Sequence, residues 1–201
     1  MKKQYSLFYS YKNIGDVLIV IFDNDKKPTR SERKGNVEVI YNQEEVIGYN
    51  IFDIRNIVKI KTEGLIYLPS PALISVINII LKNNKVEELA PMMESGYIIG
   101  EVKNMQQIDS EKTLIFVDIG KDLAQAIVKN NALKEHDKVV VATLGTRLNN
   151  GETIKASSLG ENTINAHLCS EKELQISEEN KVLVLDKEEE IGKDFFTTEA
   201  R

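Results

Sequence analysis

Apolar residues in the first half of the chain occur in short runs, and each run ends in turn-forming or charged residues. Residues 16–22 are almost continuously apolar, which is typical of a buried central strand. Residues 37–41 and 46–52 are further predicted strands, and Gly48 within the second indicates a bulge or a close backbone approach. Two more short strands are predicted at 57–60 and 65–68. The pattern therefore predicts a sheet.

A single clear helical pattern follows these strands. Ser70 is a suitable N-cap, and Pro71 fits the first helical turn. Apolar residues then recur at i, i+3, i+4, i+7 and i+8, namely Leu73, Val76, Ile77, Ile80 and Leu81. Asn83 and Asn84 end the helix. Because one apolar face of this helix must lie on the sheet, residues 1–90 are predicted to form an α+β domain.

From residue 97 onward the apolar runs are again short, like those of strands. They lie at 98–102, 114–117, 126–128, 139–142 and 182–185. A short helix is predicted at 171–176, where Ser170 is the cap and Glu173 occupies the reciprocal third position. Five short strands with one brief helix match an OB fold, so residues 97–194 are predicted to form an all-β five-stranded OB-fold barrel. Residues 91–96 are the predicted linker, and 195–201 are a tail.

The distribution of charge restricts the kind of nucleic-acid binding that the chain can support. The formal net charge is −5. Residues 1–96 hold 13 basic and 12 acidic side chains, whereas residues 97–194 hold 12 basic and 18 acidic ones. Because phosphate contacts need concentrated Lys and Arg, these numbers argue against an indiscriminate nucleic-acid binder. RNA binding by the second half would need a local basic patch.

Cysteine content and hydropathy predict a cytoplasmic protein. The longest apolar run, 17–22, is the length of a strand and far too short to span a bilayer. The N-terminus lacks the apolar core of a signal peptide. The single cysteine, Cys169, cannot form an internal disulfide, which fits a reducing compartment.

Two features of the first half have both a functional and a plain interpretation. Residues 26–35 hold five basic side chains against one acidic, and they are predicted to be a loop that either contacts phosphates or is simply solvated. Tyr49 and Phe52 are candidates for base stacking, and the alternative is that they pack within the domain.

Several short motifs occur in a fixed order in the second half. They are Val117-Asp118-Ile119-Gly120, Gln125, Lys138-Val139-Val140-Val141-Ala142, Gly145, Gly151, Ile154 and Cys169-Ser170-x-x-Glu173-Leu174. In order and spacing they resemble the tRNA-binding OB-fold domain of the bacterial phenylalanyl-tRNA synthetase β chain, of some methionyl-tRNA synthetases and of small stand-alone tRNA-binding proteins. The first half resembles the extra N-terminal domain of the YtpR-type members, on the residues Ile14-Gly15-Asp16-Val17-Leu18 and Gly48-Tyr49-Asn50-Ile51-Phe52.

Two segments depart from the family pattern. Residues 126–132 replace an Ile-Val-Cys-Gly-Ala-x-Asn stretch, and residues 160–167 replace an Arg-Gly-Val-x-Ser-x-Gly-Met run. In the second segment Ile164 and Ala166 stand where the family has a polar Ser and a flexible Gly. In the family this region is implicated in RNA contact. Because the departures fall there, the resemblance supports the fold more strongly than it supports RNA binding.

The resemblance implies a non-enzymatic RNA-binding protein that forms a homodimer and binds tRNA or another structured RNA by shape and backbone. The candidate contacts are cations and neutral donors: Lys129, Lys134, Lys138, Arg147, Lys155, Asn131, Asn162 and Asn165. These cations either share one side of the barrel or are scattered in solvent. The alternative function is a degenerate OB fold that serves as a protein–protein interaction or dimerisation module without RNA binding.

No motif for catalysis, metal or cofactor binding is found in the sequence. His167 and Cys169 lie two residues apart, but zinc needs four ligands and His136 is the only other histidine. The plain interpretation is a buried Cys169 that acts as a small apolar residue. The glycines lack the spacing of both common phosphate-binding loops. We therefore expect no enzymatic activity, no metal and no cofactor.

Overall fold

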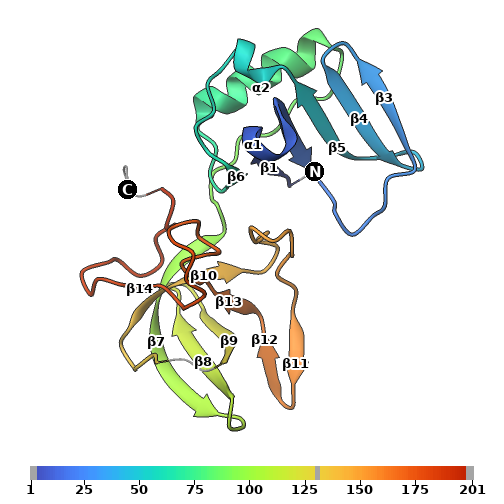
Figure 1. Ribbon diagram of the computed structural model, residues 1–201. Coiled ribbons are helices and arrows are strands. Elements are labelled where there is room, and N and C mark those ends of the chain that lie inside the picture. Colours follow the sequence, from blue (N-terminus) through green and yellow to red (C-terminus); the bar gives the residue numbers. More distant parts are fainter. Residues whose placement is uncertain (1–3, 130–131, 198–201) are drawn as a thin grey trace. The chain divides into compact units, whose positions relative to one another are not determined.

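The computed structural model describes residues 4–129 and 132–197. It divides into two compact units, an N-terminal unit of residues 1–93 and a C-terminal unit of residues 94–201. Both are built mainly from antiparallel strands (Figure 1). No helix within the described residues is both long and apolar enough to cross a membrane.

The N-terminal unit contains one antiparallel sheet of six strands. In chain order these are β1 (Ser6–Tyr9), β2 (Val17–Ile21), β3 (Arg30–Lys34), β4 (Val37–Asn42), β5 (Glu45–Phe52) and β6 (Gly64–Ile66). Their order across the sheet is β3-β4-β5-β2-β1-β6. A short helix, α1 (Tyr11–Ile14), joins β1 to β2, and a 3-10 turn, η1 (Ile54–Asn56), follows β5.

The predicted helix is present as α2 (Pro71–Asn83). The Ser70 Oγ accepts a hydrogen bond of 3.2 Å from the Leu73 N–H, so the predicted N-cap is confirmed. The buried side chains of α2 are Ile74, Ile77, Ile80 and Leu81. They share one core cluster with strand residues such as Leu7, Leu18 and Ile51. The helix therefore covers one face of the sheet.

The structure corrects two expectations for this unit and adds one strand. The segment 26–35 was expected to be a loop, but Arg30–Lys34 forms the edge strand β3, paired along its length with β4. Its polar side chains are those of an edge strand that faces solvent, which hides the strand signal in the sequence. The expected strand at 57–60 is irregular, and β1 was not predicted at all. A single short, isolated apolar run does not distinguish a strand from a covered loop.

The expectation for Gly48 is confirmed as a close backbone approach. A Cβ at this position would lie 2.6 Å from the carbonyl oxygen of Val20 on the neighbouring strand β2. The irregularity in the β4–β5 register falls opposite, between Ile40 and Tyr41. Any larger residue at position 48 would therefore push β5 away from β2.

The C-terminal unit is built around a second antiparallel sheet. Its strands are β7 (Tyr97–Gln107), β8 (Lys112–Asp118), β9 (Leu123–Lys129), β10 (Lys138–Thr143), β13 (Ala166–Leu168) and β14 (Val184–Leu185). The order is β13-β10-β7-β8-β9, and β14 pairs with β10. A separate hairpin of β11 (Ser157–Leu159) and β12 (Asn162–Ile164) connects β10 to β13.

The strand ladder of this sheet does not run continuously around a barrel in the described residues. Its two end strands, β9 and β13, are instead joined at Asn165. The Asn165 N–H donates to the Gln125 carbonyl at 3.1 Å, and the Gln125 N–H donates to Asn165 Oδ1 at 2.8 Å. The described strands therefore do not form the expected closed five-stranded barrel. Between β9 and β13 the hydrogen bonds of Asn165 to Gln125 stand in place of a strand pairing.

The expected helix at 171–176 is reduced to one turn. The Leu174 N–H donates to the Ser170 carbonyl, and Gln175 has a positive φ of 57°, which ends the turn. The predicted reciprocal cap is nevertheless formed. The Ser170 N–H donates to Glu173 Oε2 at 2.7 Å, and the Glu173 N–H donates to Ser170 Oγ at 3.2 Å.

The first described residues of the expected tail pack against the C-terminal unit. The Phe195 N–H donates to the Tyr97 carbonyl at 2.8 Å, and Phe195 is 7% exposed. The ring of Phe196 lies 5.3 Å from that of Tyr97, edge to face. Aromatic burial extends the ordered unit beyond residue 194.

Candidate nucleic-acid interface

The outer face of strands β8 and β9 is the best candidate for an RNA-binding surface. Alternate residues of these strands, including Ile115, Val117 and Ala126, lie in the core of the C-terminal unit. Side chains between them point to the opposite face. The register places Phe116 beside Gln125 and Lys112 beside Lys129 on that face.

Strand β7 extends the same face. A register shift between Val102 and Asn104 brings Asn104 opposite Phe116 and Gln106 opposite Leu114. Asn104 and Gln106 are exposed and Phe116 is partly exposed, whereas Leu114 is buried. The accessible part of the face thus combines amide donors with an aromatic ring, which is a suitable platform for stacked bases.

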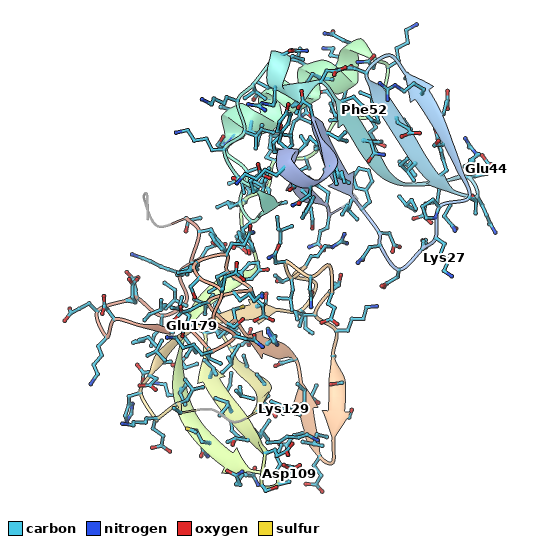
Figure 2. The ribbon with its side chains drawn as sticks, in the orientation of Figure 1. Lys27, Glu44, Phe52, Asp109, Lys129 and Glu179 are labelled. Carbon is cyan, nitrogen blue, oxygen red and sulfur yellow. The ribbon has the colours of Figure 1, made fainter. Side chains whose placement is uncertain are left out.

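Two lysines lie at the end of this face. Lys129 is exposed, and Lys112 is partly exposed with its Nζ 3.8 Å from Asp109. Both partners of that ion pair are close to half exposed, so water screens it and phosphate can compete for the cation. Figure 2 shows Lys129 and Asp109 toward the same end of the C-terminal unit. This end therefore carries two lysines next to the stacking face, and one of them is paired with Asp109.

The other predicted contacts divide into those near β9 and those on loops. Strand β12, which carries Asn162, lies against β9. Lys155 is exposed just before β11, and Lys134 is exposed in the segment before β10. The Lys134 N–H donates to Asp137 Oδ2 at 2.8 Å, which fixes the backbone at that turn. Asn131 lies outside the described residues.

Lys138 is not placed to bind phosphate. Its side chain is only 10% exposed, and its Nζ lies 2.9 Å from Glu101 Oε2. Glu101 is also contacted by Lys103 at 2.7 Å and by His136 at 3.2 Å. Hydrogen bonds from these three groups, that from Lys103 first, lower the pKa of Glu101 to about 2. In this arrangement the Lys138 ammonium faces the Glu101 carboxylate and not open solvent.

Arg147 and Asn165 have structural positions. The Arg147 carbonyl accepts a hydrogen bond of 2.7 Å from the Tyr97 hydroxyl, and its Nε and Nη1 are buried. Asn165 uses its Oδ1 and its backbone N–H to hold β9. The predicted cations therefore do not form one continuous row. Lys129 is the member that lies on the β8–β9 face.

Sequence reasoning missed Asn104, Gln106, Lys112 and Phe116. The available signal was the alternation within 112–118, which predicts a strand with two distinct faces. Whether Lys112 and Lys129 lie on the same face depends on the β8–β9 register. A shift of one residue would place them on opposite faces.

The basic segment of the N-terminal unit is largely neutralised. Arg30 pairs with Glu44 at 3.3 Å, and its guanidinium lies 3.7 Å from the centre of the Tyr41 ring. Lys26 pairs with Asp23 at 3.4 Å, and Lys34 pairs with Glu32 at 3.6 Å. Acids from β3, from the β4–β5 turn and from the loop before β3 thus pair with three of the five cations of this segment.

Tyr49 has a packing role. It is 2% exposed, and its ring lies 5.1 Å from that of Phe22 in an edge-to-face contact. Burial raises its pKa to about 12. Tyr49 is therefore part of the core, as the plain interpretation expected.

His167 and Cys169 do not form a reactive pair. His167 Nε2 lies 2.9 Å from Glu173 Oε1, so the imidazole joins the Ser170–Glu173 cap. Cys169 is fully buried, and burial raises the pKa of its thiol, which keeps it protonated and unreactive at neutral pH. The described residues contain no group of three or more His, Cys, Asp or Glu side chains arranged to hold a metal.

Comparison with known proteins identifies a relative that spans nearly the whole chain. The chain is 30% identical over 199 residues to the "Putative tRNA-binding protein YtpR" of Bacillus subtilis, and the match covers 94% of this chain and 98% of that protein. The chain belongs to the YtpR family. The family predicted from the sequence motifs is therefore confirmed. Residues 24–90 also match a family model described as a domain of unknown function (DUF4479).

Two further relatives share only part of their length with this YtpR-family chain. It is 33% identical over 122 residues to the phenylalanine–tRNA ligase beta subunit of Clostridium acetobutylicum, and 33% identical over 121 residues to that of Clostridium tetani. Each match covers 57% of this chain but 15% of the ligase subunit. The shared region is thus a module of a much larger polypeptide.

Proposed function

We propose that the protein is a non-enzymatic tRNA-binding protein that contacts RNA through its C-terminal unit. The observation that carries the proposal is the β8–β9 face as extended by β7. The exposed amides of Asn104 and Gln106 and the partly exposed Phe116 lie on the same face as Lys112 and Lys129. The names of the YtpR relative and of the two ligase subunits favour tRNA as the ligand. Because tRNA is a cytoplasmic ligand, we place the protein in the cytoplasm.

We further propose that the C-terminal unit is a variant OB fold whose barrel is completed at Asn165. In OB folds the face of the second and third strands, with the adjoining loops, binds oligonucleotides. Here those strands are β8 and β9, and the adjoining segments are the turn at 108–111 and the β11–β12 hairpin. The predicted homodimer fits a ligand as large as tRNA, because two copies double the number of phosphate contacts.

Binding of this kind depends on phosphate contacts and on shape. Each phosphate neutralised by a lysine makes the fall of log K with log salt steeper by about 0.7 to 0.9. Few basic residues on this unit lie near the proposed face, so we expect a shallow slope and moderate affinity. Folded RNA is then preferred because its rigid backbone meets several contacts at once.

A titration with bulk tRNA and with unstructured RNA of equal length, at about 50 and 200 mM salt, tests the proposal. We expect tighter binding of tRNA, and we expect Lys112→Gln combined with Lys129→Gln to weaken it and to reduce the salt slope by about 1 to 2. The matched control is Lys172→Gln with Lys181→Gln, which removes the same charge from lysines already paired with Glu178 and Glu171. Equal losses from both pairs would exclude the β8–β9 face.

A second candidate is a protein-interaction module that has lost RNA contact. The acidic excess of residues 97–194 favours it, as does Leu123, which is 50% exposed at the start of β9. Absence of binding to either RNA, together with a stable homodimer in sedimentation experiments, would support this alternative.

A further inference from the structure

A second candidate surface lies on the N-terminal unit. It is formed where α1 and η1 meet beside the start of β2. The Asp53 N–H donates to the Asp16 carbonyl at 3.0 Å, and the Arg55 N–H donates to the Asp16 carboxylate at 3.1 and 3.2 Å. The Asp16 carboxylate also accepts from the buried Tyr9 hydroxyl. Asp16, two residues after α1, thus holds the backbone of η1 beside the start of β2.

Arg55 and Tyr11 form an exposed stack across this junction. The guanidinium carbon of Arg55 lies 4.1 Å from the centre of the Tyr11 ring, and 47% of Tyr11 is exposed. Two further apolar side chains on the same two segments, Ile14 and Ile57, are 43% and 55% exposed. Because Arg55 is anchored by its backbone N–H, its guanidinium is free to present a flat face beside the ring.

Exposed lysines flank the two stacked residues in the chain. Lys12 follows Tyr11, and Lys59 and Lys61 lie in the segment after η1, which also holds Glu63. Within the described part of the chain, these three lysines and Arg55 have no acid within ion-pair distance. The cations Lys26, Arg30 and Lys34 of the basic segment, in contrast, are each paired with an acid. The nearby Glu63 carboxylate instead accepts a hydrogen bond of 2.9 Å from the Ser10 hydroxyl. This contact holds the segment after η1 beside the start of α1.

An aromatic ring paired with an arginine plane, flanked by cations without ion pairs, is suited to an unstacked base and its phosphates. A protein partner is less suited, because the centres of protein interfaces are depleted in lysine. We propose that this surface, defined by Tyr11, Lys12, Arg55, Lys59 and Lys61, binds RNA, with an unpaired base stacked on the Tyr11–Arg55 pair. The proposal rests on RNA being the ligand of the chain, and it assigns a binding role to a unit that matches a domain of unknown function.

The test compares two arginines of the full-length protein by titration with bulk tRNA. Arg55→Ser removes the stack on Tyr11, and we expect about a tenfold loss of affinity, the size of a lost base stack. Arg30→Ser is the matched control, because Arg30 also stacks on a tyrosine but is paired with Glu44. It is expected to change affinity less than twofold. Lys12→Ser with Lys59→Ser and Lys61→Ser should reduce the salt slope by about 2.

The outcomes separate this inference from the proposed function. If the Arg55 and lysine variants bind like wild type while the Lys112 and Lys129 variant loses affinity, the inference is overturned and the proposed function stands. If the wild type binds no RNA, both fall. If the N-terminal variants alone lose affinity, the inference stands and the β8–β9 face is excluded.

A crosslinking measurement on the wild-type chain decides the question where a variant fails to fold. The probe is tRNA that contains 4-thiouridine, irradiated in the complex and followed by tryptic digestion. A nucleotide adduct on the peptide of residues 4–12, which contains Tyr11, or on that of residues 56–59 supports the inference. Adducts confined to peptides of the C-terminal unit overturn it.

Discussion

Glu101 shows how a single residue changes the role of its neighbours. Its carboxylate is contacted by Lys103, Lys138 and His136, and only 15% of its side chain is exposed. Lys138, which sequence reasoning assigned to RNA, is thereby bound within the protein. A buried ammonium needs such a partner, because removing a charge from water is costly.

We expect Glu101→Gln to lower the free energy of unfolding by about 2 kcal/mol, because Lys138 loses its charged hydrogen-bond partner. Urea denaturation at neutral pH measures this change. Glu111→Gln is the control, since Glu111 is exposed and forms no ion pair with a described residue. A destabilisation of equal size in the control would show that the Glu101 contacts contribute nothing specific.

The same carboxylate predicts a dependence of stability on pH. Its pKa is about 2 in the folded protein, against an ordinary value of 4.5. Between these values the unfolded chain binds a proton that the folded chain does not, so acidification favours unfolding. We expect the difference in unfolding free energy between wild type and Glu101→Gln to be constant above about pH 5.5 and to shrink toward pH 2. A difference that does not change with pH would contradict the lowered pKa.

At the scale of elements, caps and edges decide where helices and strands end. Helix α2 begins at Pro71 behind the Ser70 cap, and it continues because its apolar face is covered by the sheet. The Ser170–Glu173 cap has equally good hydrogen bonds, yet only one turn follows it. A cap stabilises a helix that packing already favours, and it cannot extend one without a buried face.

We expect Ser70→Ala to destabilise the N-terminal unit by about 1 kcal/mol, because the Leu73 N–H loses its acceptor. The control is Ser75→Ala in the same helix, which removes a hydroxyl bonded to the Pro71 carbonyl and gains helix propensity. Thermal unfolding followed by circular dichroism compares the two variants. The cap would be unimportant if Ser75→Ala proved the more destabilising change.

At the scale of the whole molecule, the chain forms two separate cores. Ile77 lies in the core of the N-terminal unit and Ile115 in that of the C-terminal unit, and both are fully buried. The two core clusters share no residue. Each unit therefore has its own hydrophobic driving force for folding.

We expect Ile77→Ala and Ile115→Ala each to cost about 3 kcal/mol, but in different units. Hydrogen exchange measured by mass spectrometry should show lost protection in β2 and β5 for the first variant, and in β8 and β10 for the second. Loss of protection in both units from either substitution would show that the cores unfold together.

Local rules predicted the helix and most central strands from the sequence, whereas the family was predicted from the resemblance of its ordered motifs. Ser70, Pro71 and the i, i+3, i+4 repeat specify α2 because capping and helical periodicity act within a few residues. Strand β10 was found because Val139, Val140 and Val141 are buried on both sides. Strand β3 was missed because an exposed edge strand owes its pairing to β4 and not to its own side chains.

The candidate sites were less predictable than the elements. Lys129 was identified from the sequence, but its neighbours Lys112 and Phe116 depend on the β8–β9 register. The Tyr11–Arg55 stack joins residues 44 positions apart in the chain, and Asp16 holds the backbone of η1, which carries Arg55, beside the start of β2. No local pattern marks either arrangement.

The sequence alone determined the type of most elements, the position of the main helix and membership of the YtpR family. Those properties follow from short-range periodicity and from residue order, which any window of the chain contains. The tertiary structure decided which charges are available to a ligand. Lys138 is bound to Glu101, Arg30 is bound to Glu44, and Arg55 and Lys129 are exposed, because ion pairing depends on which residues folding brings within about 4 Å.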